Sequence, residues 1–421
     1  MGKSPTGAVN AGDRKRSGPQ GGLARIRGFD GLRGVAAFVV VIHHYLCLLH
    51  PELIPGMSDE TVGWIDGPYH ILWNGRFAVM VFFVLSGFVI AASAERHRRN
   101  LIGSVIARYG RLSIPVAASC LLAWFWLALI PYGTEGLSAI VDPPSRWWRY
   151  SHQETVPPIW SALWDGFVGV IVKAGSDFNN VLWTIRIELV GSFGLFALYA
   201  AAPVRRRGVA LTLCAAAVML FTAHIYSTFV LGAALYEAAK RGALSRAPAA
   251  WGVVALVVGV LVGGAGSGAH ERLSLPETAT AWQIGNEKGL WAALAAAALV
   301  YAVFSLQALQ RMLESPVAQW LGRVSFALYL VHVPLLYTVV ASAVVAGDMP
   351  RAVLAASYFA GALLLAHLFT ILVDEPVIRR MSALRSTLSK GFVGRAPDAL
   401  AHLARRPLLA LQALPKTWKR K

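Results

Sequence analysis

The chain has 421 residues, of which 56% are hydrophobic and only 14% are charged, and its net charge is +17. A soluble globular protein carries roughly 25% charged residues, so this composition indicates a membrane protein. The positive charge does not indicate a nucleic-acid partner, because the basic residues stand in short tracts between apolar runs.

The N-terminal residues 1–28 are polar and basic and lack the apolar core of a cleavable signal peptide. We therefore expect a disordered cytoplasmic tail. A membrane-spanning helix needs about 20 apolar residues, with a range of roughly 17–25. The apolar stretches that follow predict an all-α, polytopic membrane protein with about ten transmembrane helices. These are residues 33–50, 75–94, 112–131, 181–201, 208–224, 225–240, 250–266, 288–308, 321–344 and 352–373.

The distribution of Lys and Arg predicts the orientation of these helices. Most of the 39 basic residues fall in the two tails and in alternate loops, whereas loop 51–74 carries four acidic residues and no Lys or Arg. Cytoplasmic loops are rich in Lys and Arg, so both termini are expected in the cytoplasm. The membrane domain, residues 29–376, is then followed by a basic amphipathic tail, residues 377–421, which we expect along the anionic inner leaflet.

A long external loop is expected at residues 132–180, and it is rich in aromatic residues. Its side chains fit either an aromatic belt at the membrane interface or a platform that stacks on a sugar ring. They are Trp147, Trp148, Tyr150, Trp160 and Trp164. The cysteines Cys47, Cys120 and Cys214 lie far apart in apolar runs and predict packing, with neither a disulfide framework nor a metal site.

Ionisable residues inside membrane spans are costly and usually face an interior cavity. Arg33 and His44 are eleven residues apart, so they share one helix face and lie about 16 Å apart along its axis. This stripe predicts a passage with an anion anchor at its cytoplasmic mouth and an imidazole suited to proton transfer at its end. His43 lies off this stripe, and a packing hydrogen bond is the better interpretation for it.

Two further pairs carry charge in the spans. Arg108 and Arg111 are three residues apart at a cytoplasmic helix end, where two guanidinium groups suit phosphate binding, although positive-inside charge is an alternative. Arg186 and Glu188 are two residues apart and point in opposite directions on a helix, so each needs its own partner. Glu188 then orients a histidine or balances an arginine.

The late span contains His332 and, two residues on, Pro334. Proline lacks an N–H, so the carbonyl of Leu330 loses its helical partner and a polar, kinked site is expected there, with packing alone as the alternative. For His367 packing is the better interpretation. In an earlier span, the small pair Ser86-Gly87 allows a helix or a slender ligand to approach closely.

At this point the residues resemble those of a known family, the bacterial acyltransferase-3 family, whose hallmark is an Arg, ten residues, and then a His. The motifs that carry the resemblance follow one another in the family's order over residues 29–376. They are Phe29-Asp30-Gly31-Leu32-Arg33 with His44, Phe82-Phe83-Val84-Leu85-Ser86-Gly87-Phe88, Arg108-x-x-Arg111, Trp183-Thr184-Ile185-Arg186-Ile187-Glu188, the run Ser325 to Leu335 with Tyr329, His332 and Pro334, and Glu375-Pro376.

The resemblance implies a membrane O-acyltransferase, most often an O-acetyltransferase, in the bacterial inner membrane. Such an enzyme moves an acyl group from cytoplasmic acyl-CoA to a hydroxyl of a cell-surface polysaccharide, lipopolysaccharide, exopolysaccharide or glycolipid. Acyl-CoA is then a co-substrate, and no bound cofactor or metal is expected.

The same resemblance implies roles for individual residues. His44 would be the catalytic histidine and Glu188 an important acid, while Arg33, Arg108 and Arg111 would contact the phosphates of acyl-CoA. The candidates for an acceptor or secondary site are Trp183, Arg186, Tyr329, His332 and Arg76, the last at a position where many family members carry an acidic or neutral residue.

A proton-coupled transporter of a glycan or lipid is the alternative function, because it also needs His, Glu and Arg inside the membrane. Transporters commonly contain internal repeats and helices broken at matching points of two halves. Neither feature stands out in this sequence, which favours the acyltransferase.

Overall fold

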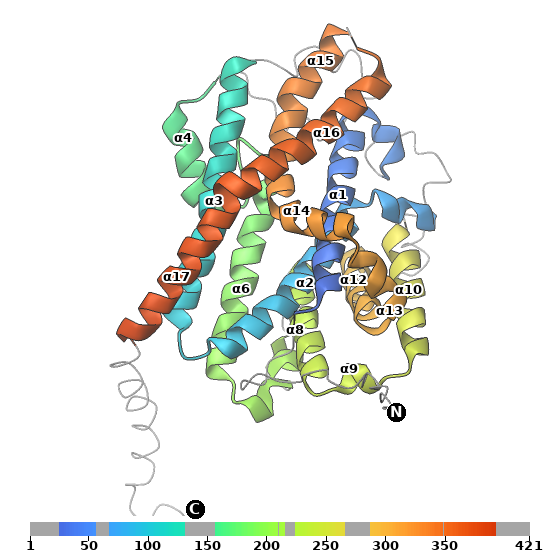
Figure 1. The fold of residues 1–421 in the computed structure, drawn as a ribbon, viewed down its shortest axis with the longest axis vertical. Helices are drawn as coiled ribbons and strands as arrows, with labels where there is room; N and C mark the ends of the chain where they lie inside the picture. Colours follow the sequence, from blue (N-terminus) through green and yellow to red (C-terminus); the bar gives the residue numbers. More distant parts are fainter. Residues whose placement is uncertain are drawn as a thin grey trace, which may run out of the picture.

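The computed structural model describes residues 25–55, 67–130, 156–208, 210–214, 224–265, 287–347 and 349–392. Throughout these residues the chain is helical and has no strand, as the sequence predicts (Figure 1). Six helices are long and apolar enough to cross a membrane, and each coincides with an expected span. They are α1 (Arg27–Leu49), α2 (Gly75–Arg96), α3 (Leu101–Leu129), α6 (Trp183–Ala201) with its leading turn η7 (Asn180–Leu182), α14 (Pro316–Leu335) continued by η11 (Leu336–Val340) and α15 (Ala341–Ala346), and α16 (Arg351–Phe369) continued by η12 (Thr370–Asp374) and α17 (Glu375–Phe392).

The remaining four expected spans differ from the prediction, so the number ten is not confirmed. Helix α12 (Glu287–Ser305) is followed by α13 (Gln307–Leu313) at an angle of 94°, and the pair makes at most one further span. Helices α8 (Ser227–Lys240) and α10 (Ala249–Gly264) are shorter than a full span. Most of the expected span 208–224 lies outside the described residues.

The expected external loop 132–180 is partly helical. Its first part, with Trp147, Trp148 and Tyr150, lies outside the described residues. Its second part folds into α4 (Ile159–Trp164), a wide π-helical turn η6 (Asp165–Gly169) and α5 (Val170–Val172). This segment packs on α3, because a Cβ on Gly166 would lie 2.3 Å from the Cα of Ala117. It returns the chain to the start of α6, while Trp160 and Trp164 remain exposed.

The last helix also extends further than the sequence predicts. Helix α17 continues α16 through the π-helical turn η12, and Figure 1 shows the two as one long, inclined rod. It packs along α3, where the amide of Asn100 donates a hydrogen bond of 3.0 Å to the carbonyl of Arg385. The first part of the expected cytoplasmic tail is therefore an ordered helix against the bundle, and residues 393–421 lie outside the described part.

Glycines bring α1 and α14 into backbone contact at the centre of the bundle. A Cβ on Gly34 would lie 2.3 Å from the backbone nitrogen of Gly322, and one on Gly322 would lie 2.2 Å from the carbonyl oxygen of Asp30. Small residues at such a crossing let membrane helices approach closely. This contact fixes the lateral position of His44 on α1 relative to the inner face of α14.

The small pair Ser86-Gly87 allows a helix to approach closely, one of the two purposes that the sequence allows. A Cβ on Gly87 would lie 2.3 Å from the carbonyl oxygen of Phe229 on α8, so the glycine permits close helix packing. Ser86, on the other side of α2, lines the cavity described below. The helix that supports one wall of the cavity is thus pressed against α8.

A buried ionic network fixes the ends of α2 and α8. Arg207 is fully buried and forms an ion pair with Glu95, while its guanidinium lies 4.7 Å from the ring centre of Tyr199. Glu237 on α8 lies 3.7 Å from Arg207 and accepts a hydrogen bond of 3.0 Å from Tyr199. Arg207 belongs to a basic tract whose charge the sequence explains by the positive-inside rule, and the structure shows that this arginine has a structural role.

Candidate active site

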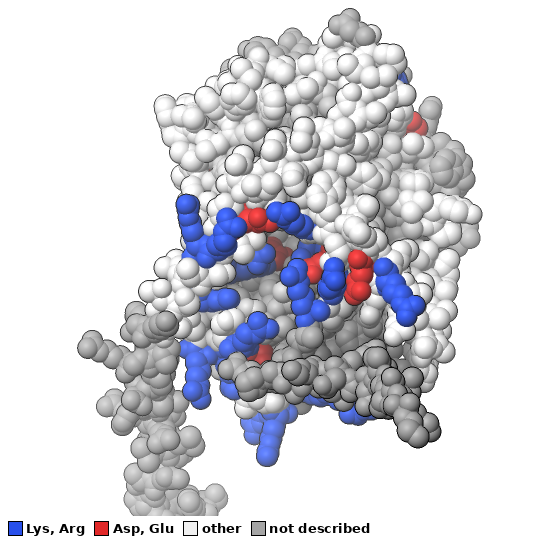
Figure 2. Space-filling model, viewed as in Figure 1, with Lys and Arg blue, Asp and Glu red and all other residues white. Residues whose placement is uncertain are grey.

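A cavity of about 380 Å³ opens between α1, α2, α3, α6, α14 and the α16–α17 rod. Figure 2 shows a hollow on this face with Lys and Arg side chains round its edge and a few Asp and Glu side chains among them. The charged side chains that line the cavity are Arg25, Arg33, Arg108, Arg111, Arg323, Asp30, Glu188, Asp374 and Glu375. The four residues Arg33, Arg108, Arg111 and Glu188, which the sequence singled out, thus share one cavity.

Most of these arginines are held by carboxylates. Arg33 lies 3.3 Å from Asp30 one helical turn away, and Arg323 on α14 lies 2.7 Å from Glu375 on α17. Arg108 forms an ion pair with Glu188 and donates a hydrogen bond of 3.0 Å to the hydroxyl of Ser192. Glu188 therefore balances an arginine, one of the two outcomes that the sequence left open.

Arg111 differs from the other arginines of the cavity. It is exposed and has no ion pair with any residue in the described part of the chain. Its position one turn from Arg108 on α3 lets both side chains face the same space, as the spacing predicts. An anionic ligand that enters the cavity would meet a guanidinium that needs no exchange of protein partners.

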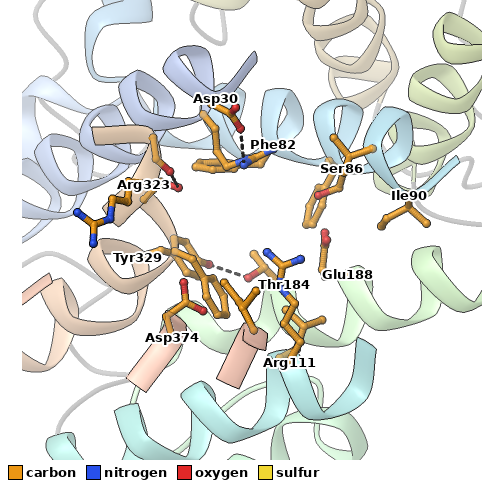
Figure 3. A pocket seen from close by; sticks show the side chains of 18 of the residues that line it. Asp30, Phe82, Ser86, Ile90, Arg111, Thr184, Glu188, Arg323, Tyr329 and Asp374 are labelled. Atoms are coloured by element: carbon orange, nitrogen blue, oxygen red, sulfur yellow. Dashed lines mark hydrogen bonds and ion pairs between the residues drawn. The ribbon is translucent and has the colours of Figure 1, made fainter. Parts of the chain in front are cut away.

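The inner end of the cavity is closed by aromatic and hydroxyl side chains. Tyr329 donates a hydrogen bond of 2.5 Å to the carbonyl of Val181, and its oxygen lies 2.8 Å from the hydroxyl of Thr184 (Figure 3). This contact joins α14 to the start of α6. The ring of Tyr329 also lies 5.9 Å from that of His332, centre to centre.

His44 and His332 form a hydrogen-bonded pair next to this inner end. Nδ1 of His44 lies 2.8 Å from Nε2 of His332, and Nδ1 of His332 lies 2.9 Å from the carbonyl of Leu328. A carbonyl only accepts, so Nδ1 of His332 carries a proton and donates it. In the neutral rings, Nε2 of His332 then accepts from Nδ1–H of His44, which leaves the lone pair of His44 on Nε2.

Neither histidine is among the residues that line the cavity. The cavity reaches Tyr329, and Tyr329 separates it from His332, which is fully buried. The cavity therefore extends from the arginine cluster to Tyr329 and does not reach His44, so the continuous passage that the sequence predicts to this imidazole is not seen.

The other candidate residues lie elsewhere. Arg76 is exposed at the start of α2, at the opposite end of that helix from the arginine cluster. Trp183 and Arg186 are exposed on a side of α6 that does not line the cavity. The structure therefore does not bring Trp183 and Arg186 into the cavity, whereas the start of α2 with Arg76 packs against the ring of His43, the neighbour of His44.

Two histidines interpreted as packing residues have such contacts. His43 is buried, and its Nδ1 lies 3.1 Å from the carbonyl of Trp73. The ring of His367 accepts a hydrogen bond of 3.4 Å from the indole of Trp320. The three cysteines are free, and no group of His, Cys, Asp and Glu in the described residues is placed to hold a metal ion.

The carbonyl freed by Pro334 has side-chain partners, as the sequence predicts. The hydroxyl of Ser119 on α3 donates a hydrogen bond of 2.7 Å to the oxygen of Leu330, and the amide of Asn179 donates one of 2.9 Å. The polar group left by the proline is thus satisfied inside the bundle. This contact supports α14 two residues before His332.

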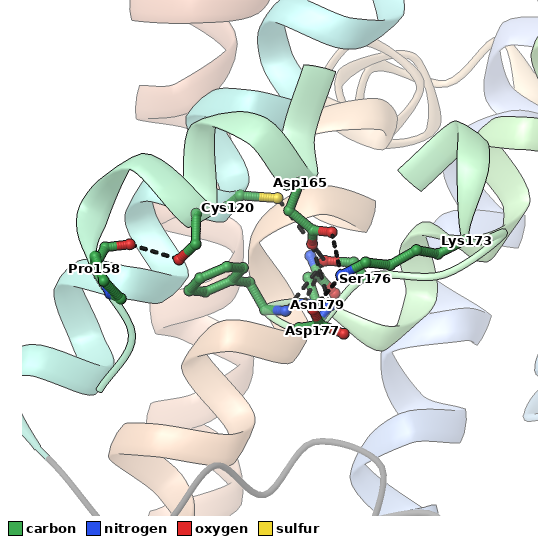
Figure 4. A network of polar contacts seen from close by, with 9 residues as sticks. Cys120, Pro158, Asp165, Lys173, Ser176, Asp177 and Asn179 are labelled. Carbon is green, nitrogen blue, oxygen red and sulfur yellow. Dashed lines mark hydrogen bonds and ion pairs between the residues drawn. The ribbon is translucent and has the colours of Figure 1, made fainter. Parts of the chain in front are cut away.

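Asn179 belongs to a polar network that anchors the α4–α5 segment (Figure 4). Asp165 is almost fully buried and accepts hydrogen bonds from the hydroxyl of Ser176 and from the backbone of Asp177. The hydroxyl of Ser176 in turn accepts from the backbone nitrogen of Asn179 at 3.1 Å. The network holds the turn that leads into α6 and hence the position of Thr184.

Sequence reasoning missed several members of the site. Asp30 and Asp374 lie near the ends of apolar spans, where isolated acids are common. Thr184 is a small residue in the Trp183–Glu188 motif, in which only the Trp, Arg and Glu residues are singled out. A signal existed for Asp30, because an acid three residues before Arg33 lies on the same helical face. For Asp374 the only signal is its place directly before the Glu375-Pro376 pair.

Taken together, the long apolar helices and the arginine-rich cavity define a helical membrane protein with a cationic cavity close to a pair of buried imidazoles. The family model described as an acyltransferase domain, that of the acyltransferase-3 family, matches residues 26–372, and the chain belongs to this family. It is therefore an acyltransferase, which decides against the transporter alternative.

A characterised relative agrees with this assignment. The chain is 27% identical over 375 residues to the O-acetyltransferase PaAT-1 of Phomopsis amygdali, a match that covers 73% of this chain and 72% of the relative. No solved structure matches the chain significantly.

Proposed function

We propose that this protein transfers an acyl group, most often acetyl, from cytoplasmic acyl-CoA to a hydroxyl of a cell-surface glycan or glycolipid in a bacterial inner membrane. The observation that carries this proposal is the cavity, which joins an arginine cluster to Tyr329 beside the His44–His332 pair. Acyl-CoA serves as a co-substrate and no cofactor is held. The acyl group moves at His44, close to the middle of the bundle.

The chemistry of the cavity fits the donor. Guanidinium groups bind phosphates through paired N–H donors, and Arg33, Arg108 and Arg111 supply three of them. A volume of about 380 Å³ lies within the range of small-molecule pockets, roughly 300–1,000 Å³. The phosphates dock at the arginines, and the acylated thiol passes inward beside Tyr329 toward the two imidazoles.

His44 has the chemistry of a general base. With its lone pair on Nε2, it takes the proton of the acceptor hydroxyl as the oxygen attacks the thioester carbonyl. The C–S bond then breaks, and the leaving thiolate takes up a proton to give free CoA. In the alternative route Nε2 attacks the thioester first and carries the acyl group until the hydroxyl displaces it. Glu188 contributes by holding Arg108 in the cavity.

The orientation of the protein supports a reaction across the membrane. We propose that both termini face the cytoplasm and that about ten transmembrane helices are present, as the distribution of Lys and Arg predicts. The arginine cluster then opens to cytosolic acyl-CoA. Arg76 lies at the other end of α2, and Trp183 is exposed on α6, so these two residues are proposed as contacts of the acceptor.

Purified protein in lipid nanodiscs, supplied with labelled acetyl-CoA and a bacterial glycolipid fraction, tests the proposal. The wild type should release CoA and label the glycolipid, and His44→Ala should do neither while still inserting into the membrane. His43→Gln is the matched control on the same helix, because the hydrogen bond of His43 goes to the carbonyl of Trp73 and not to His332, and it should remain active. CoA release that persists in His44→Ala contradicts the role of this histidine.

The acceptor class needs its own experiment. Mass spectrometry of surface glycans from a strain that lacks the gene should reveal the loss of one acyl modification, restored by the wild type and not by His44→Ala. A full set of acyl groups in the deletion strain would contradict a glycan acceptor.

A further inference from the structure

One carboxyl group in the cavity, that of Asp374, forms no ion pair within 4 Å in the described residues, and the charge of Arg111 acts on it only from a longer distance. Asp374 is 5% exposed, lines the cavity, and its Oδ1 atom has no hydrogen-bond partner in the described residues. Its neighbour Glu375 shows the contrast, since it pairs with Arg323 at 2.7 Å. Figure 3 shows the Asp374 carboxylate directed into the cavity beside Tyr329.

Burying a carboxyl group without a partner costs free energy, so such groups in membrane proteins usually meet a ligand or a partner. The local backbone favours a ligand. Asp374 ends the π-helical turn η12, a type of turn that is frequent at functional sites and that offsets the following helix. The same turn leaves Glu375 at the mouth of the cavity and Asp374 on its inner wall.

The depth of Asp374 indicates which part of a ligand it meets. Glu375, the residue after Asp374, pairs with Arg323 on α14. Tyr329 lies six residues after Arg323 on the same helix, about 9 Å further into the bundle. Asp374 is therefore inside the ring of arginines and outside the Tyr329–His332 contact. A donor with its phosphates on the arginines and its thioester at the imidazoles places the connecting arm at this level.

The arm of acyl-CoA, pantetheine, carries amide N–H groups through a section of the cavity with many apolar walls, such as Phe82, Phe83 and Phe326. An amide N–H in apolar surroundings needs an acceptor. Nearby hydroxyls are already engaged, because Tyr329 donates to Val181 and Ser325 donates to Gly322. Oδ1 of Asp374 is a buried acceptor without such a partner.

We infer that Asp374 is a positioning residue that accepts a hydrogen bond from an amide N–H of the pantetheine arm, an inference that rests on the proposed function. It fixes how far the thioester reaches toward His44. The residue thereby makes the enzyme selective for thioesters that carry the amide-bearing arm, independently of the nucleotide.

Kinetics with two donors test this role. Acetyl-CoA contains the nucleotide, phosphates and arm, whereas S-acetylpantetheine contains only the arm. Asp374→Leu should raise KM by about tenfold or more for both donors, since hydrogen bonds to charged groups contribute roughly 1.5–3 kcal/mol and 1.4 kcal/mol is tenfold. Asp374→Asn keeps an oxygen acceptor and should recover most of the affinity for both donors. Glu314→Gln, at an exposed carboxyl group that does not line the cavity, is the control and should leave KM for both donors unchanged.

A second measurement, protection from thermal unfolding by pantetheine, tests the same contact without relying on the activity of the variants. Pantetheine should protect the wild type and Asp374→Asn from thermal unfolding, and it should protect neither Asp374→Leu nor the smaller Asp374→Ala. A rise in KM for acetyl-CoA but not for S-acetylpantetheine overturns the inference, because it places the contact at the nucleotide. An equal rise in KM in Asp374→Asn and Asp374→Leu also overturns it, because the oxygen acceptor would then have no role. Both outcomes leave the proposed function intact, because the wild type still consumes acetyl-CoA. A wild type that neither binds CoA nor releases it contradicts the proposed function itself.

Discussion

Nδ1 of His44 on α1 and Nε2 of His332 on α14 lie 2.8 Å apart, ten residues along each helix from the close contact between Gly34 and Gly322. His332 is in turn fixed by the carbonyl of Leu328. The carbonyl of Leu328 therefore sets the tautomer of His332, and His332 in turn favours the tautomer of His44 that carries its proton on Nδ1. We therefore expect His332 to act as a positioning residue for His44.

Replacement of His332 should therefore lower kcat more than it changes KM for acetyl-CoA. His332→Ala removes the side-chain partner of the His44 Nδ1–H and leaves it the backbone carbonyl of Val40, and a misplaced catalytic group costs about a hundredfold in rate. His44→Ala removes the base and should cost about 10²–10⁴-fold. Steady-state kinetics in nanodiscs measure both, with thermal unfolding as the check on folding.

His332→Gln is the informative control, because its side-chain oxygen can accept the same hydrogen bond. It should recover a substantial part of kcat relative to His332→Ala. Equal losses in the two variants would show that His332 acts through bulk alone.

The sequence predicts this site unevenly, and the reasons are physical. Arg33, Arg108 and Glu188 stand out because each is a charge beside an apolar run, and the structure places all three at one cavity. The His44–His332 contact joins residues 288 positions apart, and no local periodicity reports such a distance. Asp374 sits where an acid at a span end looks ordinary.

The sequence also predicts some parts of the fold better than others. Six of the ten expected spans are confirmed, because about 20 apolar residues in a row leave few alternatives to a membrane helix. The sequence predicts a loop where the α4–α5 segment is helical, because Ile159–Val172 is too short for a span and no local pattern reveals the Asp165 network that supports it. The bend after Ser305 was missed because apolar composition alone does not define helix direction.

Arg108 and Arg111 should respond differently to replacement by alanine. Arg111→Ala removes no ion pair, so the free energy of unfolding should change by less than about 0.5 kcal/mol while KM for acetyl-CoA rises about tenfold. Arg108→Ala leaves Glu188 without its partner and should also destabilise the protein by about 1–3 kcal/mol. Donor kinetics and denaturant unfolding of the two variants separate these effects.

Arg380→Ala on α17 is a suitable control, since this arginine is exposed and does not line the cavity. It should leave both KM and stability unchanged. An Arg111→Ala protein with normal affinity for acetyl-CoA would argue against phosphate binding at this residue.

The glycine contact between α1 and α14 predicts a strong effect of a single methyl group. In Gly34→Ala the new Cβ would lie 2.3 Å from the backbone of Gly322, so the helices must separate. Overpacking of this kind costs about 1–3 kcal/mol, and the separation should lower kcat by moving His44 away from His332. Gly194→Ala on α6 meets nothing within 4 Å and should be tolerated. Comparable losses in the two variants would contradict the close packing.

The carbonyl of Leu330 provides the most direct test of how Pro334 shapes this region. Ser119 and Asn179 are its partners, so the double replacement by alanine should leave a buried carbonyl unsatisfied and cost about 1–3 kcal/mol of stability. Pro334→Ala restores a backbone N–H that can donate to Leu330 within the helix. In this background the same double replacement should cost less, by about 1 kcal/mol, because the carbonyl now has a helical partner. Unfolding measured for the four proteins gives the coupling, and an identical cost in both backgrounds would mean that Ser119 and Asn179 stabilise the fold by some means other than the freed carbonyl.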